Sequence, residues 1–176
     1  MKMLIATNNQ GKLKEIQAIF AQVYPDIVTP KDIGLQLEVE EDGDTFYENA
    51  KKKAVAFMRA SGMDALADDS GLCVDALGGA PGVYSARFAG LDATDQENNA
   101  LLLQKMQGVE NRNARFVSCV VLAKTDGSIV SATGESSGVI LEKPLGQGGF
   151  GYDPLFLDEA YQKTYAQLTG EEKNKD

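Results

Sequence analysis

Two long strand-like segments in the second half of the chain constrain its fold more than any other feature. They span residues 114–125 and 128–141, and the dipeptide Asp126-Gly127 separates them. This dipeptide is well suited to a tight hairpin, because glycine readily adopts the positive φ that such turns require. The sequence therefore predicts a long antiparallel hairpin.

Shorter helices and strands alternate along the rest of the chain. Hydrophobic residues at helical spacing predict three helices, at about residues 11–22, 45–61 and 94–107. Their candidate caps include Asp44, Thr45, Asp92 and Thr94. Apolar runs predict short strands at residues 2–6, 65–67 and 72–74, and another near residue 156. This order is typical of an α/β fold built around a mixed sheet flanked by helices.

The chain has the length and composition of one compact domain. Its 176 residues are 43% hydrophobic, which allows a sizeable core without disulfides or structural metal. We therefore expect a single domain over residues 1–176, with two lobes. Cys73 and Cys119 lie in apolar segments without CxxC spacing, so buried free thiols in a reducing compartment are the favoured interpretation.

No segment of the sequence is typical of a membrane anchor or a secretion signal. The most apolar stretch, residues 116–123, is too short to cross a bilayer, and the N-terminal apolar run turns polar at Thr7. We therefore expect a cytoplasmic protein that does not bind membranes.

Net charge and the absence of histidine limit the possible chemistry. A net charge of −9 opposes binding to a nucleic acid backbone, so any polyphosphate ligand needs placed lysines, backbone amides or a divalent cation. Without histidine, the chain cannot form a Ser-His-Asp triad or a histidine-ligated zinc site. Carboxylates must therefore carry any acid–base or metal chemistry.

The first polar loop, TNNQGK, joins a predicted strand to the start of a predicted helix. It consists of Thr7, Asn8, Asn9, Gln10, Gly11 and Lys12. Free N–H groups and the helix dipole favour an anion at such a position, so the loop is a candidate phosphate site. It does not match the Walker A pattern. Taken alone, Asn8 or Asn9 as an ordinary helix cap is the favoured interpretation.

Acidic and basic runs flank the start of the second predicted helix. Residues 38–44 include the adjacent pair Glu40 and Glu41, whose carboxylates would suit a hard cation. Taken alone, such a run is usually solvated surface. Three lysines follow at positions 51–53 and could offset phosphate charge, although at least two of them are expected to face solvent.

The segment Asp68-Asp69-Ser70-Gly71 is predicted as a sharp polar turn directly after an apolar strand. Strand ends are where the sites of α/β proteins collect. Side-chain alternation directs Asp68 and Asp69 to opposite sides, so that one is structural and the other faces the site. An Asx-turn is an equally good interpretation of this segment by itself.

A glycine-rich run at residues 148–153 follows the hairpin and contains two aromatic residues. Its glycines allow the backbone to approach a ligand closely, and the aromatic rings could stack on a base. The alternative is a glycine-rich turn with Phe150 in the core. Arg87 is a candidate partner for a phosphate or carboxylate, and equally for a surface salt bridge.

Four motifs taken together resemble the inosine triphosphate pyrophosphatase family, which hydrolyses non-standard purine nucleotides. In order they are ATNNQGKLKEI, EEDGDTFYENAKKKA, ADDSGLCVDALGGAPGVYSARFAG and GGFGYDPLF. The resemblance extends from about Ile5 to Lys173 and is much longer than a chance motif. It implies an elongated α/β fold with a long mixed sheet, a cleft between two lobes, and usually a homodimer.

The resemblance also implies an activity, a cofactor and residue roles. The reaction would be the hydrolysis of ITP, dITP or XTP to a monophosphate and pyrophosphate, with Mg²⁺ as the cofactor. The loop from Thr7 to Lys12 would hold the triphosphate, with Lys12 on a phosphate oxygen. Glu40 and Asp69 would hold the magnesium, and Asp69 would accept the proton of the attacking water.

Further residues match the family's nucleoside contacts. They are Ser70, Phe150, Gly151, Tyr152, Asp153 and, near the C-terminus, Lys173. Glu41 and Lys53 are weaker candidates for the site.

One departure from the family pattern concerns base recognition. The family continues after an EEKN-type segment with Ser-His-Arg and a further helix, neither of which this sequence contains. We therefore expect weaker base discrimination. Two alternatives stay open: a general nucleotide pyrophosphatase or phosphatase with weak base preference, and a nucleotide-binding protein with impaired turnover. The set of Lys12, Glu40 and Asp69 argues against the second.

Overall fold

The fold is described from a computed structural model of the chain. It covers residues 2–6, 10–20, 24, 26–40, 42–146 and 151–167. The chain divides into two compact units, which we describe separately. Unit 1 comprises Met1–Asp69 and Ser118–Thr133, and unit 2 comprises Ser70–Val117 and Gly134–Asp176.

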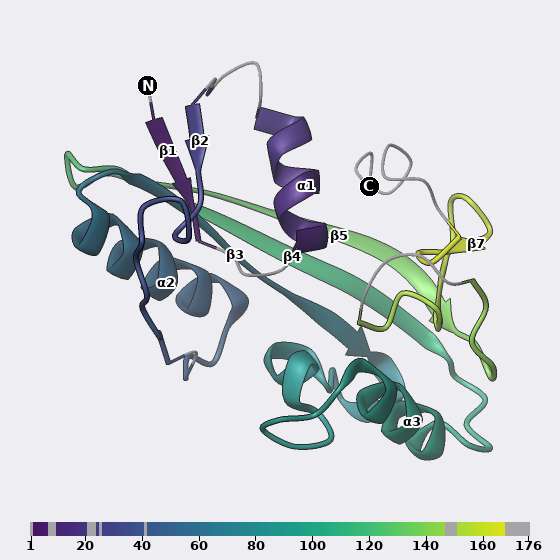
Figure 1. The fold of residues 1–176 in the computed structure, drawn as a ribbon. Coiled ribbons are helices and arrows are strands. Elements are labelled where there is room, and N and C mark those ends of the chain that lie inside the picture. Colours follow the sequence, from purple (N-terminus) through teal and green to yellow (C-terminus); the bar gives the residue numbers. More distant parts are fainter. Residues whose placement is uncertain are drawn as a thin grey trace. The chain divides into compact units, whose positions relative to one another are not determined.

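Seven strands form a mixed sheet in the order β2-β1-β3-β4-β5-β6-β7 (Figure 1). Their bounds are β1 Lys2–Ile5, β2 Asp26–Val28, β3 Asp64–Val74, β4 Asn113–Ala123, β5 Ile129–Ile140, β6 Phe156–Asp158 and β7 Lys163–Thr164. β1 pairs in parallel with β2 and β3, whereas β6 pairs antiparallel with β5 and β7. The predicted mixed α/β fold is confirmed. The short strands β2 and β7 were not predicted.

The predicted hairpin is formed by β4 and β5, which are neighbours in the sheet and are joined by a tight loop. Lys124 N–H donates to the carbonyl of Ser128 (3.0 Å), so the loop closes around residues 125–127. Gly127 has a φ of 92°, which a side chain would disfavour. Asp126 Oδ1 accepts the N–H of Ser128 (2.8 Å). The Asp-Gly pair therefore closes the hairpin as expected.

In unit 1, alternate residues of β1 point to opposite faces of the sheet. Leu4 and Ala6 pack with α2 (Phe46–Ser61) on one face. Met3 and Ile5 pack with α1 (Gln10–Phe20) on the other. Because both faces are covered, β1 is apolar throughout its buried part, as is usual for a parallel strand between helices (Figure 1).

The second predicted helix is α2, and Thr45, one of the two candidate residues, caps its start. Thr45 Oγ1 accepts the N–H of Glu48 (3.1 Å) at its start. At its end, Gly62 adopts the left-handed conformation and donates its N–H to Met58 (2.9 Å). The first predicted helix is observed as α1 as far as Phe20, and the rest of its predicted span lies outside the described residues.

Unit 2 is built around α3 (Asp95–Lys105), which corresponds to the third predicted helix. Thr94 and Glu97 form a capping box at its start, so Thr94 rather than Asp92 is the cap. The helix contributes Leu102 to a core that β3, β4, β5 and β6 complete. The largest members of this core are Leu72, Met106, Ile140, Tyr152, Leu155, Phe156 and Tyr165. Two short 3₁₀ helices, η1 (Asp75–Leu77) and η2 (Gly82–Arg87), precede α3.

The predicted sharp turn at residues 68–71 is wrong, because β3 continues through this segment without a break. The Asx-turn alternative fails for the same reason. Aspartate and serine have low strand propensity, but packing against neighbouring strands overrides such local preferences. The apolar stretches on both sides, residues 65–67 and 72–74, are buried and belong to the same strand.

Both cysteines are free and buried, as expected. Burial raises the pKa of the Cys73 thiol, so this group stays protonated at neutral pH. No helix in the described part of the chain is both long enough and apolar enough to cross a membrane.

Candidate active site

In unit 1, three of the six predicted phosphate residues are described, and they lie at the start of α1. Gln10, Gly11 and Lys12 form the first turn of this helix of 11 residues. The N–H groups of a first turn have no partners within the helix, so they are suited to an anion at the position that the sequence predicts. Thr7, Asn8 and Asn9 lie outside the described residues, as does the side chain of Lys12.

The acidic loop before α2 is tied to that helix by its charged residues. Asp42 forms an ion pair with Lys52. The hydrogen bond and the charge of Lys52 hold the pKa of the Asp42 carboxyl below its usual range. Glu40 is exposed at the beginning of the same loop, and Glu41 lies outside the described residues.

Two of the three lysines in α2 face solvent, as expected for this run. Lys51 and Lys52 are exposed, whereas Lys53 is half-buried. Lys53 Nζ donates to the backbone carbonyl of Asp68 at 3.2 Å. This bond brings a positive charge to the segment of β3 that precedes Asp69. Lys53, one of the weaker site candidates, therefore lies beside β3, the strand that carries Asp69.

Asp68 and Asp69, which are neighbours on β3, differ in burial. Asp68 is 7% exposed, whereas Asp69 is half-buried. Asp69 Oδ2 accepts a hydrogen bond from Asn49 Nδ2 of α2 at 3.2 Å. Asp69 is thus the more accessible of the two carboxylates, and a side chain of α2 orients it.

The sequence motifs did not identify Asn49 as a site residue. It is completely buried, and its Oδ1 accepts the N–H of Gly43 at 2.7 Å. Asn49 stands next to Ala50 on the buried face of α2. A polar residue on an apolar helix face is a signal that could have identified it, because a buried amide must find hydrogen-bond partners.

In unit 2, the predicted nucleoside residues that the structure describes lie in a turn before β6 and on β3. Gly151 opens the described part of the turn with a φ of 58°. Its N–H donates to Asp95 Oδ2 (2.9 Å), and its carbonyl accepts from Asn99 Nδ2 (3.1 Å). Two side chains of α3 therefore hold both backbone groups of this glycine. Neither was identified from the sequence, because the pairing joins residues more than 50 positions apart.

The ring of Tyr152 belongs to the core of unit 2. It is 5% exposed, and its hydroxyl donates to the carbonyl of Ser85 at 2.6 Å. Burial, with a contribution from the charge of Asp95, raises the pKa of this phenol. Such burial does not fit a ring that stacks on a base, so Phe150 is the remaining aromatic candidate in this run.

The other predicted nucleoside residues differ in accessibility. Asp153 is buried, and Ser70 is half-buried on β3. Phe150 and Lys173 lie outside the described residues. Arg87 packs its guanidinium over the ring of Tyr84, with 5.0 Å to the ring centroid.

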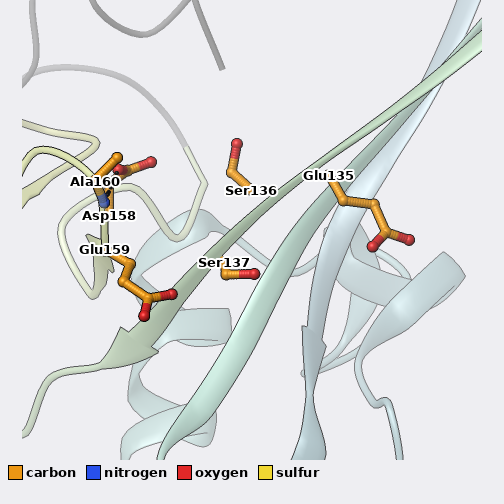
Figure 2. A pocket seen from close by; sticks show the side chains of 6 residues that line it. All are labelled: Glu135, Ser136, Ser137, Asp158, Glu159 and Ala160. Carbon is orange, nitrogen blue, oxygen red and sulfur yellow. Dashed lines mark hydrogen bonds between the residues drawn. The ribbon is translucent and has the colours of Figure 1, made fainter.

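Two pockets in the structure contain none of the predicted site residues. One, of about 310 Å³, is lined by Glu135, Ser136 and Ser137 of β5 and by Asp158, Glu159 and Ala160 at the end of β6 (Figure 2). Asp158 Oδ1 already accepts the N–H groups of Ala160 and Tyr161 (2.9 and 3.1 Å). The other, of about 570 Å³, is lined by Phe57 and residues between 30 and 38.

Solved structures place this arrangement in a known class of α/β proteins. The Ham1 protein of Staphylococcus aureus is 40% identical, with a TM-score of 0.86 over 98% of this chain and 89% of that one. The HAM1 protein of Coxiella burnetii is 35% identical, with a TM-score of 0.88 over 99% of this chain and 90% of that one.

Sequence comparison agrees with the structural comparison. The model of the Ham1 family matches residues 3–175, and the chain belongs to this family. A protein of Desulforamulus reducens named dITP/XTP pyrophosphatase is 50% identical over 99% of this chain and 88% of its own length. A protein of the same name from Thermus thermophilus is 50% identical over 98% of this chain and 84% of its own length. The resemblance seen in the sequence motifs is therefore confirmed.

Proposed function

We propose that this chain hydrolyses non-standard purine nucleoside triphosphates, such as dITP, ITP and XTP, to the monophosphate and pyrophosphate. The observation that carries this proposal is the 50% identity, over 99% of the chain, to a protein named dITP/XTP pyrophosphatase. The placement of Asp69 beside a buried amide and a lysine of α2 supports it.

In this proposal, Asp69 is the general base. Its carboxylate takes a proton from a water molecule, whose oxygen attacks phosphorus as the α–β anhydride bond breaks and pyrophosphate leaves. The hydrogen bond from Asn49 restricts rotation of this carboxylate. A carboxylate suits this role because proton transfer depends first on its position relative to the water.

We propose Mg²⁺ as the cofactor, held by Glu40 and Asp69. The donor chemistry fits, because magnesium commonly binds through one or two carboxylates together with substrate phosphates. In the described ranges no three acidic or cysteine side chains gather into a metal site. When bound, the ion would neutralise phosphate oxygens and acidify water.

The triphosphate would lie at the start of α1, with Thr7 to Lys12 around it. Free backbone N–H groups at a helix N-terminus bind phosphate oxygens without needing many basic residues. This matters in a chain whose net charge is −9. Lys12 and Lys53 would supply the local positive charge.

The nucleoside would contact Ser70 and the run Phe150 to Asp153, with Lys173 as a further contact. The two bonds from α3 to Gly151 support this assignment, because they hold both backbone groups of this glycine in place. The ring of Tyr152 is buried, so its contribution would be through the backbone.

The deciding assay measures pyrophosphate release from inosine, xanthosine, guanosine, adenosine and pyrimidine triphosphates, with and without magnesium. Preference for the first two supports the proposal, and similar rates for all would favour the alternative of a general nucleotide pyrophosphatase. Orthophosphate as the product would indicate a phosphatase. Tight binding without turnover would indicate a nucleotide-binding protein.

Two substitutions separate the metal role from the phosphate role. Glu40→Gln removes the charge of one metal ligand, so we expect activity to fall and to recover in part at higher magnesium. Lys12→Ala removes a phosphate contact, so we expect a higher KM at unchanged magnesium dependence. Initial rates over a grid of magnesium and substrate concentrations test both. Identical profiles for the two variants would contradict the division of roles.

Asp95→Ala tests whether α3 positions the nucleoside turn. The N–H of Gly151 loses its acceptor, and we expect KM to rise about fivefold, as for the loss of one hydrogen bond, with a smaller change in kcat. Asp95→Asn keeps an acceptor oxygen and should restore KM. Gln96→Ala is the control, because Gln96 is the next residue of the same helix and is exposed. An unchanged KM for Asp95→Ala would remove this turn from the substrate site.

We further propose that the protein is a cytoplasmic homodimer that binds neither nucleic acid nor membranes. The net charge of −9 would repel a nucleic acid backbone at long range, which supports the proposal that the protein does not bind nucleic acid. Light scattering of the purified chain measures the oligomeric state directly, and a monomer at all concentrations would contradict the dimer.

A further inference from the structure

One buried amide links the acidic loop before α2 to β3, the strand that carries Asp69. Asn49 Oδ1 accepts the N–H of Gly43 (2.7 Å), and Asn49 Nδ2 donates to Asp69 Oδ2 (3.2 Å). The side chain is 0% exposed, so water cannot replace either partner. Its two ends therefore hold two segments of unit 1 that are 26 positions apart in the sequence.

The loop lies close against this amide at Gly43. A Cβ atom at Gly43 would lie 2.8 Å from Asn49 Oδ1 and 2.8 Å from the Cβ of Glu48. The absence of a side chain at position 43 is thus what allows the loop to approach the amide closely.

We propose that Asn49 is the positioning residue for Asp69, and that the same amide sets the position of the loop that carries Glu40. The inference rests on the proposed function. Because the amide is planar and both ends are engaged, the direction of the Nδ2–H bond follows from the Gly43 contact. The orientation of the Asp69 carboxylate is therefore coupled to the acidic loop.

Several charged groups surround this amide. On α2, Glu48 accepts the N–H of Asp44 (2.9 Å), and Lys53 binds the carbonyl of Asp68 (3.2 Å). On β3, the carboxyl group of Asp68 is adjacent to that of Asp69 in sequence. A new carboxyl at position 49 would enter this set directly beside Asp69.

Asn49→Asp is the sharpest test, because it keeps the shape and the acceptor of the amide but replaces the donor by a carboxyl oxygen. The hydrogen bond that orients the Asp69 carboxylate is then lost, and a second carboxyl group faces it instead. We expect kcat to fall at least about tenfold, with a smaller change in KM. A purely structural role would lower stability without this split between kcat and KM.

Asn98→Asp is the matched control. Asn98 is also a buried helical asparagine whose amide binds two backbone groups, the N–H of Ala89 (2.9 Å) and the carbonyl of Ala86 (3.0 Å). It contacts no carboxylate in these bonds. The same substitution there should lower thermal stability while leaving kcat near the wild-type value.

The outcomes separate cleanly. Wild-type kcat for a folded Asn49→Asp variant would overturn the inference. If this variant does not fold, Gly43→Ala decides, since its Cβ displaces the same amide: a reduced kcat at similar KM supports the inference, and an unchanged kcat overturns it. Failure of the wild-type chain to release pyrophosphate would instead overturn the proposed function, and the inference with it.

Discussion

Asp69→Asn is expected to reduce pyrophosphate release at least about 100-fold while leaving the protein folded. The substitution removes the proposed general base and one proposed magnesium ligand at once. It conserves size, and the amide oxygen can still accept the hydrogen bond that Asn49 donates to position 69. Single-turnover rates, together with a thermal unfolding curve, measure the two parts of this expectation.

Asp68→Asn is the control for this experiment, because it makes the same change at the neighbouring position of the same strand. Asp68 is more buried than Asp69, so we expect the loss of its charge to change stability more than kcat. Near-wild-type turnover by Asp69→Asn would remove this residue from the mechanism. A larger loss of kcat in Asp68→Asn than in Asp69→Asn would mean that the two roles are reversed.

Gly138→Ala is expected to destabilise the protein by about 3 kcal/mol, a large part of the free energy of unfolding of a typical domain. Gly138 of β5 lies opposite Asp158 of β6. An added Cβ would collide with the backbone carbonyl of Leu157 and would lie 2.8 Å from Cζ of Phe156. The backbone carbonyl is held in the sheet, so it cannot move aside easily.

Phe156 cannot make room either. It is 1% exposed and packs edge-on against Tyr165, with 4.9 Å between the ring centroids. Gly134→Ala is the matched control, because a Cβ at this position of the same strand meets nothing within 4 Å. Urea unfolding should separate the two variants, with Gly134→Ala within about 0.5 kcal/mol of wild type. Equal stabilities would show that β5 and β6 separate at little cost.

Much of the fold followed from local sequence features. The Asp-Gly dipeptide predicted the hairpin, and Thr45 and Thr94 predicted the starts of two helices. These features succeed because a turn or a cap is decided by residues close together in the chain. The same reasoning failed at residues 68–71, where pairing with neighbouring strands outweighed the local preference for a turn.

The candidate site was predictable to the extent that its residues belong to sequence motifs. Asp69 and Glu40 were found in this way, and their roles stay predictions. The residues that we propose to orient the site were not found. Asn49, Asp95 and Asn99 act through bonds to distant segments, and an asparagine or aspartate in a helix gives no sign of its partner.

The sequence by itself determined the class of fold, the limits on the chemistry and the family, because composition, local turns and long motifs are all contained in the order of residues. Only the tertiary structure decided that residues 68–71 are part of a strand, that Asn49 binds Asp69, and that Tyr152 is buried. The physical reason is that burial and the partners of a buried polar group depend on which distant segments pack together.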